Sequence, residues 1–158
     1  LAGLRHAPLR PAQCRAMRHD LLLRPFEITD HDAALALWQR TPGVGLSAAD
    51  RREAIAAYLA RNPGTSFVAE RNGAVVGTLL CGHDGRRGLI HHLVTDTTQR
   101  RQGVARALVQ RGLRALRDQG IDKCHLMVFA DNTEGLAFWA GIGGQRRGEL
   151  ALVSLTTG

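Results

Sequence analysis

The stretch that decides the fold runs from residue 89 to residue 120 and reads LIHHLVTDTTQRRQGVARALVQRGLRALRDQG. It predicts a buried strand over 89–95, a short polar loop, and a helix that ends at Gly120. Small and apolar side chains recur at steps of three and four residues, which would place them on one helix face against a sheet. These residues are Ala105, Leu108, Val109, Gly112, Leu113 and Leu116.

The junction between this strand and this helix is typical of a phosphate-binding site. The backbone N–H groups of a first helical turn have no intrahelical partner and lie at the positive end of the helix dipole, where phosphate binds. Gly103 and Ala105 leave this backbone accessible, and Arg100, Arg101 and Arg106 add positive charge. Taken alone, a single glycine after a strand is weak evidence, and an ordinary helix start explains the spacing equally well.

Two motifs in the chain resemble those of one enzyme family. The pattern Arg100-x-x-Gly103-x-Ala105 resembles the acetyl-CoA pyrophosphate loop of the GCN5-related N-acetyltransferase (GNAT) superfamily. A second block, about 30 residues further on, resembles the family's Asn-(x)6-Tyr segment and the glycine-rich turn that follows it. It comprises Asn132, Phe138, Trp139 and the glycine-rich stretch 141–144. Two motifs in the expected order are much more specific than either alone, and the resemblance covers residue 21 to the C-terminus.

The resemblance implies an α/β fold with a mixed, mostly antiparallel central sheet, helices on both faces, and a splay between the strands that flank the main helix. The residue patterns predict a matching order of elements. Helices are expected after Thr29-Asp30 and after Ser47, and a hairpin turn at Asn72-Gly73. A strand is expected over 123–129, followed by a final pair of strands within 145–155.

Composition bounds the remaining possibilities. The chain has 158 residues and 44% hydrophobic residues, which suits one globular domain. The resemblance makes this a single acetyltransferase domain over 21–158, and we expect a flexible arm over 1–20 before it. No apolar run approaches a membrane span, and we expect a cytoplasmic protein with reduced cysteines and no metal site. The net charge of +7 comes from scattered arginines, so nucleic acid is an improbable partner.

Acetyl-CoA as cosubstrate and an amine acceptor follow from the resemblance. It implies that Leu93, Val94 and Thr95 offer backbone groups to pantetheine, with an N–H near Val94 stabilising the oxyanion. It also implies that Asn132 binds pantetheine, although this side chain is equally suited to capping its own helix. The pyrophosphate loop would comprise Arg100, Arg101, Gln102, Gly103, Val104, Ala105 and Arg106.

His91 is the candidate general base. It lies nine residues before Arg100, where family members often carry Glu or His, and its ordinary pKa suits the removal of an ammonium proton. Alternation along a strand predicts that His91 and His92 point to opposite sides of the sheet. The competing interpretation makes one imidazole a packed side chain and the other a polar surface group. Glu27 and His83, on neighbouring segments, are weaker candidates for the base.

Trp139 departs from the family pattern, which often has a proton-donating tyrosine at this position. An indole N–H cannot supply a proton at neutral pH, so we expect no dedicated acid and a tryptophan packed against the pantetheine arm. Burial of Trp139 in the helix–sheet core is the alternative.

The acceptor pocket is expected beside the two N-terminal helices. The resemblance places Trp38, Val44 and Leu46 there, and the alternative for Trp38 is the core. The chain is thus predicted to transfer acetyl from acetyl-CoA to a primary amine of a small molecule, protein or peptide, within a ternary complex. A non-catalytic acyl-CoA sensor module is the alternative, motivated by the missing tyrosine. A homodimer through the C-terminal strands is a further possibility, since such dimers are common in the family.

Overall fold

The computed structural model describes residues 21–158, so the predicted arm over 1–20 lies outside the described residues. Nine helices and strands follow one another in this part of the chain, with short 3-10 turns at Ile28–Asp30, Ala48–Asp50 and Thr97–Gln99. They are β1 (Leu22–Pro25), α1 (His31–Arg40), α2 (Arg52–Arg61), β2 (Phe67–Arg71), β3 (Ala74–His83), β4 (Gly88–Thr95), α3 (Val104–Asp118), β5 (Cys124–Leu126) and α4 (Thr133–Gly141).

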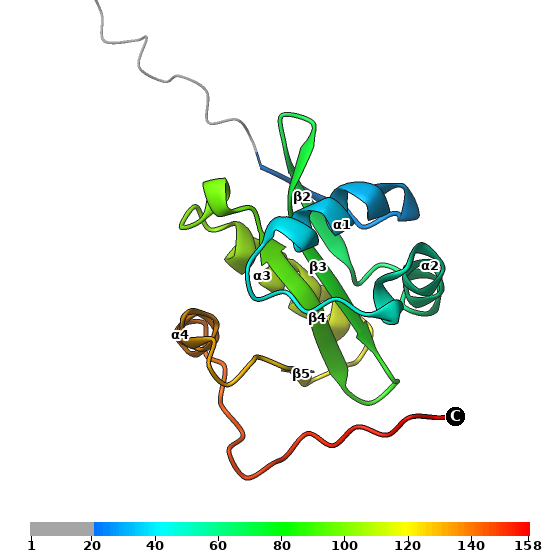
Figure 1. Cartoon of the computed structure of the whole chain (residues 1–158), viewed down its shortest axis with the longest axis vertical. Coiled ribbons are helices and arrows are strands. Elements are labelled where there is room, and N and C mark those ends of the chain that lie inside the picture. Colours follow the sequence, from blue (N-terminus) through cyan, green and yellow to red (C-terminus); the bar gives the residue numbers. More distant parts are fainter. Residues whose placement is uncertain (1–20) are drawn as a thin grey trace, which may run out of the picture.

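The strands form one mixed sheet in the order β1-β2-β3-β4-β5. Neighbouring strands from β1 to β4 are antiparallel, and β5 runs parallel to β4. Asn72 and Gly73 join β2 to β3 with φ angles of 54° and 75°, the double positive φ of a tight hairpin turn. Figure 1 shows α1 and α2 on one face of the sheet and α3 on the other. The predicted α/β fold with helices on both faces is therefore confirmed.

Each face of the sheet has its own apolar core. The α3 face buries Leu79 and Ile90 beneath Leu108 and Leu116, as the helical spacing predicts. The opposite face packs α1 and α2 over the alternate residues of the strands. Its buried members are Phe26, Ala34, Leu37, Trp38, Ile55, Val68, Leu80 and Val94.

The C-terminal part of the prediction is wrong. No strand forms within 145–155, and β5 spans only Cys124–Leu126 instead of 123–129. A strand persists only where a neighbouring edge satisfies its backbone N–H and C=O groups. The segment after α4 makes a turn in which Leu150 N–H donates to Arg147 C=O (3.2 Å) and then runs past β5 (Figure 1), with Leu152 and Val153 exposed.

Candidate active site

An opening in the sheet lies between β4 and β5. The two strands pair only at Gly88↔Cys124, Leu89↔His125 and Ile90↔Leu126. Beyond Ile90, no strand within residues 21–158 pairs with this edge of β4, because the chain after Leu126 turns away toward α4 (Figure 1). The splay predicted between the strands that flank the main helix is therefore present. Its unpaired edge includes Leu93, Val94 and Thr95, which are the residues expected to face pantetheine.

The unpaired edge of β4 runs directly into the loop before α3. Gly103, the N-cap of α3, has a φ of 79°, and no side chain caps this helix. The N–H groups of Val104, Ala105 and Arg106 therefore lie in a first turn that offers them no intrahelical acceptor. A Cβ placed on Gly103 would meet no atom within 4 Å, so the space before these groups is open. Such a cradle fits an anion such as the CoA pyrophosphate.

Replacing Gly103 with alanine should raise the KM for acetyl-CoA by about tenfold, since a left-handed conformation costs a residue with a Cβ roughly 1–2 kcal/mol and the cradle would relax to avoid it. Steady-state kinetics with varied acetyl-CoA measures this change. Gly120→Ala is the matched control, because Gly120 has a φ of 80° and equally open space at the far end of α3. An equal rise in KM in both variants would contradict the assignment of the cradle.

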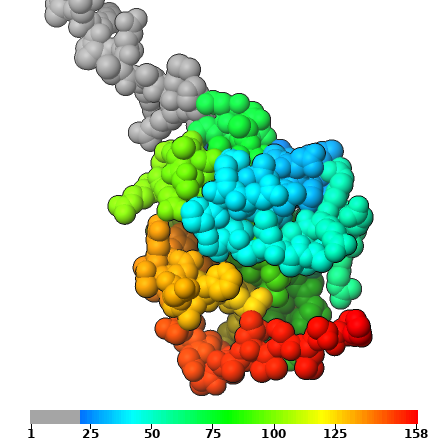
Figure 2. Space-filling view, viewed as in Figure 1, coloured from blue at the N-terminus to red at the C-terminus, as the bar shows by residue number. Residues whose placement is uncertain are grey.

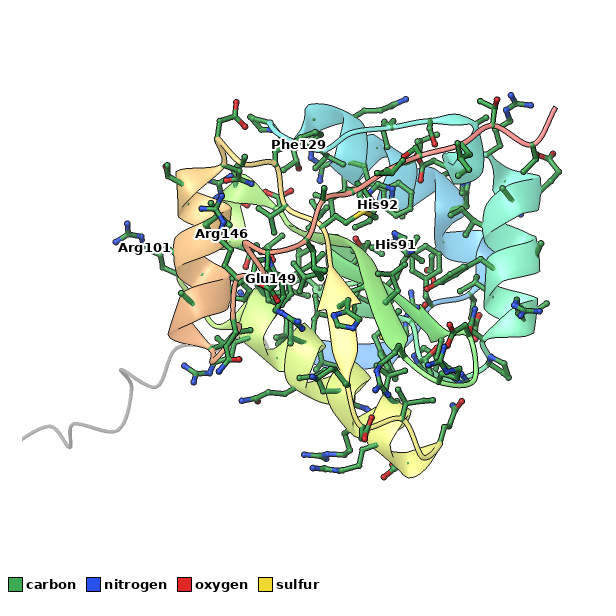
Figure 3. All side chains as sticks on the ribbon, turned by 90° about the horizontal axis from the view of Figure 1, so that it is seen from below. His91, His92, Arg101, Phe129, Arg146 and Glu149 are labelled. Carbon is green, nitrogen blue, oxygen red and sulfur yellow. The ribbon has the colours of Figure 1, made fainter. Side chains whose placement is uncertain are left out.

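The basic side chains of the loop have different surroundings. Arg100 Nη1 lies 3.4 Å from Glu134 Oε1, which links the loop to the first turn of α4. Arg101 has a φ of 60° and points away from the molecule (Figure 3), and Arg106 is exposed. The Gln102 side chain is held by Arg71. Among residues 21–158, Arg101 and Arg106 thus have no ion-pair partner, whereas Arg100 and the Gln102 side chain are engaged.

The prediction that His91 and His92 point to opposite sides of the sheet is wrong. Thr78 pairs with Val94 whereas Leu80 pairs with His91, so β4 contains one extra residue opposite β3. His92 absorbs this bulge with a φ of 40°. Both imidazoles therefore lie on the α1/α2 face (Figure 3), where His91 contacts the ring of α2 residue Tyr58 and His92 the indole of α1 residue Trp38.

His92 is fixed on three sides. Its Nε2 lies 2.5 Å from Asp50 Oδ1, its ring stacks on Trp38 with centroids 4.4 Å apart, and its carbonyl accepts a bond from the Thr78 hydroxyl. A carboxylate only accepts hydrogen bonds, so Nε2 carries the proton. Asp50 Oδ2 also accepts the backbone N–H of Ser47 (2.7 Å), completing a capping box. Sequence reasoning missed Asp50, because the Ser47-x-x-Asp50 spacing indicates a helix start and not the contact with β4.

His91 is half-buried, and its ring nitrogens form no hydrogen bond with the described residues. Tyr58 approaches it edge-on, with ring centroids 5.9 Å apart. Burial lowers the pKa of His91, the neighbouring His92 lowers it further, and the Asp50 carboxylate opposes them. With its pKa below the ordinary value, His91 is neutral at pH 7 and ready to accept a proton.

The rate should therefore show an acidic limb set by His91. If His91 is the general base, kcat/KM should decline as pH falls through the lowered pKa of this imidazole, below about 6.5, because the ring becomes protonated. Asp50→Asn removes a charge that raises the pKa of His91, so the limb should move to lower pH. A pH profile of the wild type and both the Asp50→Asn and His91→Ala variants tests this. An unchanged limb in His91→Ala would contradict it.

The residues expected around the acceptor are only partly accessible. Trp38 is 1% exposed and lies in the core, so its indole offers no surface for direct contact with an acceptor. It can affect an acceptor only through His92, on which it stacks. Val44 is half-buried against the same core, and Leu46 is 39% exposed. Gly45, between these two residues in the sequence, lies beside the ring of Phe129, since a Cβ built on it would be 3.5 Å from that ring. Phe129 is 62% exposed. Figure 2 shows this meeting of the segment after α1 with the segment after β5. Phe129 was missed because only the fold brings these two segments together.

Comparisons with known proteins agree with this geometry. The model of the acetyltransferase (GNAT) family matches residues 29–143. An acetyltransferase of Pectobacterium atrosepticum is 36% identical over 110 residues, which cover 70% of this chain and 77% of that protein. The chain belongs to the GNAT family.

Solved structures show the same fold. Ard1 from Thermoplasma volcanium has a TM-score of 0.69 at 23% identity, covering 78% of this chain and 81% of that one. A predicted acetyltransferase from Clostridium acetobutylicum, crystallised with acetyl-CoA, has a TM-score of 0.69 at 17% identity, covering 85% of this chain and 96% of that one. The recognition of a GNAT acetyltransferase from its two motifs is thereby confirmed.

The second GNAT motif forms α4. Asn132 caps this helix, because its Oδ1 accepts the N–H of Gly135 (2.9 Å). Trp139 is half-buried against the α3-face core and lies edge-on to Phe138, with ring centroids 5.1 Å apart. The helix cap predicted for Asn132 is present, whereas the contacts of Asn132 and Trp139 with pantetheine stay predictions.

Residues 21–158 show neither a metal-binding cluster nor a membrane-spanning helix. The described side chains include no group of three or more His, Cys, Asp or Glu residues placed to hold a metal ion. Within the same residues, no helix has both the length and the apolar character needed to cross a membrane.

Proposed function

We propose that this GNAT protein transfers the acetyl group of acetyl-CoA to a primary amine of a small molecule, protein or peptide. One observation carries the proposal: the unpaired β4 edge is followed, after the loop over 96–103, by the uncapped first turn of α3. Pantetheine would bind along Leu93, Val94 and Thr95, and the phosphates at the Gly103 turn. Acetyl-CoA supplies an activated acyl group, and the chain supplies its orientation and a base.

The proton of the acceptor is the main chemical obstacle. A lysine-like ammonium has a pKa of about 10.4 and attacks only after it loses a proton. His91, neutral at pH 7, accepts that proton directly or through water. The amine nitrogen then forms the new C–N bond, the thioester C–S bond breaks, and CoA leaves as the thiolate. The second proton that the nitrogen loses as the amide forms passes to solvent water. A backbone N–H near Val94 stabilises the negative charge on the carbonyl oxygen.

The leaving thiolate needs no dedicated acid in this proposal. An ordinary thiol has a pKa near 8.5, so the thiolate is a tolerable leaving group at neutral pH. The Trp139 indole donates at most a hydrogen bond, and its packing against the α3-face core suits a wall of the pantetheine channel. Unchanged acetyl-CoA affinity and an unchanged rate in Trp139→Ala would exclude that role.

Release of free CoA thiol, measured over a panel of small amines and peptides, tests the proposed function. Turnover with one acceptor class, together with acetylated product identified by mass spectrometry, would support N-acetylation. Tight binding of acetyl-CoA with no thiol release on any acceptor would instead support the non-catalytic sensor module.

A further inference from the structure

Arg71, at the end of β2, reaches the phosphate-binding loop from the far side of the hairpin. Its Nη1 donates to the side-chain carbonyl of Gln102 (2.6 Å) and to that of Gln99. Both glutamines are distant along the chain, 28 and 31 residues away. Gln99 precedes and Gln102 follows the Arg100-Arg101 pair in the sequence. One guanidinium therefore holds the loop on both sides of these two arginines.

We propose that Arg71 is a positioning residue that holds this loop in its anion-binding conformation. The inference rests on the proposed function, because the loop is taken as the site of the CoA pyrophosphate. Arg71 acts on the ligand through Gln99 and Gln102. It therefore affects how well the diphosphate binds and leaves the acetyl-transfer step unaffected.

The backbone of the loop needs such support. Arg101 has a φ of 60°, a left-handed conformation that is unfavourable for a residue with a Cβ. Gly103 is also left-handed, and no side chain caps the helix that follows. Without an external anchor, the segment between Gln99 and Gly103 would lower its free energy by relaxing toward ordinary backbone angles. Relaxation would turn the N–H groups of the first turn of α3 away from a common point.

Arg71 is mounted rigidly enough to serve as that anchor. It pairs with Ala74 across the tight Asn72-Gly73 turn, and it lies in a central antiparallel pair of the sheet. Its Nε is buried and has no hydrogen-bond partner among the described residues. An unsatisfied buried donor is unfavourable, and the side chain nevertheless keeps this position because Nη1 bonds both glutamines.

The start of the loop has a separate anchor. Asp96 accepts the N–H and the hydroxyl of Thr98 and receives Arg40 Nη2 at 2.7 Å. These bonds lower the pKa of Asp96 to about 2, so the carboxylate stays charged at any working pH. This anchor fixes the turn after β4, and Arg71 extends the support to Gln102, the neighbour of Gly103.

Two thioesters distinguish this role from a general structural one. Acetyl-CoA carries the diphosphate, whereas S-acetylpantetheine lacks it and uses only the channel along β4. Arg71→Met keeps the apolar stem and removes the hydrogen bonds. Its KM for acetyl-CoA should rise about tenfold with little change in kcat, and its KM for S-acetylpantetheine should not change. Arg71→Lys, a point charge without the fork geometry, should recover only part of the loss.

Further variants keep the test decisive. Gln102→Leu should reproduce the effect, and the double variant with Arg71→Met should lose no more than either single one. Arg114→Ala, on an exposed face of α3, is the control for loss of positive charge. An equal loss on both thioesters, or no loss on acetyl-CoA, would overturn the inference.

Calorimetry separates this inference from the proposed function. If the wild type turns over no amine, binding of CoA and of pantetheine still measures the contribution of the diphosphate. A selective loss of CoA affinity in Arg71→Met would then support the positioning role even though N-acetylation had failed. An equal affinity for CoA in the wild type and in Arg71→Met would overturn it.

Discussion

Replacing His91 with alanine should lower kcat by about 10²- to 10⁴-fold and leave the affinity for acetyl-CoA unchanged, because a positioned general base contributes on this order to the rate. His91 lies on the α1/α2 face of the sheet with a neutral imidazole, and its ring makes no hydrogen bond with the described residues. Initial rates at saturating acetyl-CoA, with calorimetric binding measured in parallel, give the two quantities.

His92→Ala is the matched comparison, because His92 is the neighbouring imidazole on the same face. Its Nε2 is engaged by Asp50 and its ring by Trp38, so its loss should act chiefly on the acceptor-side wall and raise the KM for the amine. The opposite result, a large loss of kcat in His92→Ala with little change in His91→Ala, would assign the base to the His92–Asp50 pair.

Trp38→Ala should lower the free energy of unfolding by about 3–5 kcal/mol, since it removes a large, fully buried side chain and leaves a cavity. The indole packs near Phe26, stacks on His92 and donates its Nε1–H to the Thr78 hydroxyl at 2.8 Å. Because whole domains are stable by only about 5–15 kcal/mol, this loss is a large share of the total. Urea unfolding followed by circular dichroism measures it.

Trp38→Phe separates packing from the hydrogen bond. It keeps most of the volume and should cost clearly less than the alanine variant, although the Thr78 hydroxyl loses its donor. Trp139→Ala is the comparison for a half-buried tryptophan and should also cost less. A loss under about 1 kcal/mol in Trp38→Ala would contradict the placement of this indole in the core.

Much of the fold could be predicted because local signals and tertiary packing agree. The apolar face of α3 and the Asn72-Gly73 turn carry periodicity and turn chemistry that operate within a few residues. The C-terminal strands fail because alternation of apolar residues describes a segment suited to a sheet but not the presence of an edge to pair with. The short pairing of β5 with β4 supplies no such edge beyond Leu126.

The site shows the same division. The Gly103 turn is local, and the sequence pattern located it. The side of the sheet to which His92 points depends on one extra residue between two pairs of a ladder, which no strand pattern reveals. Asp50 and Arg71 act on residues 42 and 28 or more positions away, so only the folded chain shows what they hold.

The most direct test of direct acetyl transfer is the initial-velocity pattern, measured with acetyl-CoA and an acceptor from the amine panel. Attack within a ternary complex predicts intersecting double-reciprocal lines and no acetylated enzyme after incubation with acetyl-CoA alone. Parallel lines, together with an acetyl group found on Cys124 by mass spectrometry, would contradict this account and indicate a covalent acyl-enzyme.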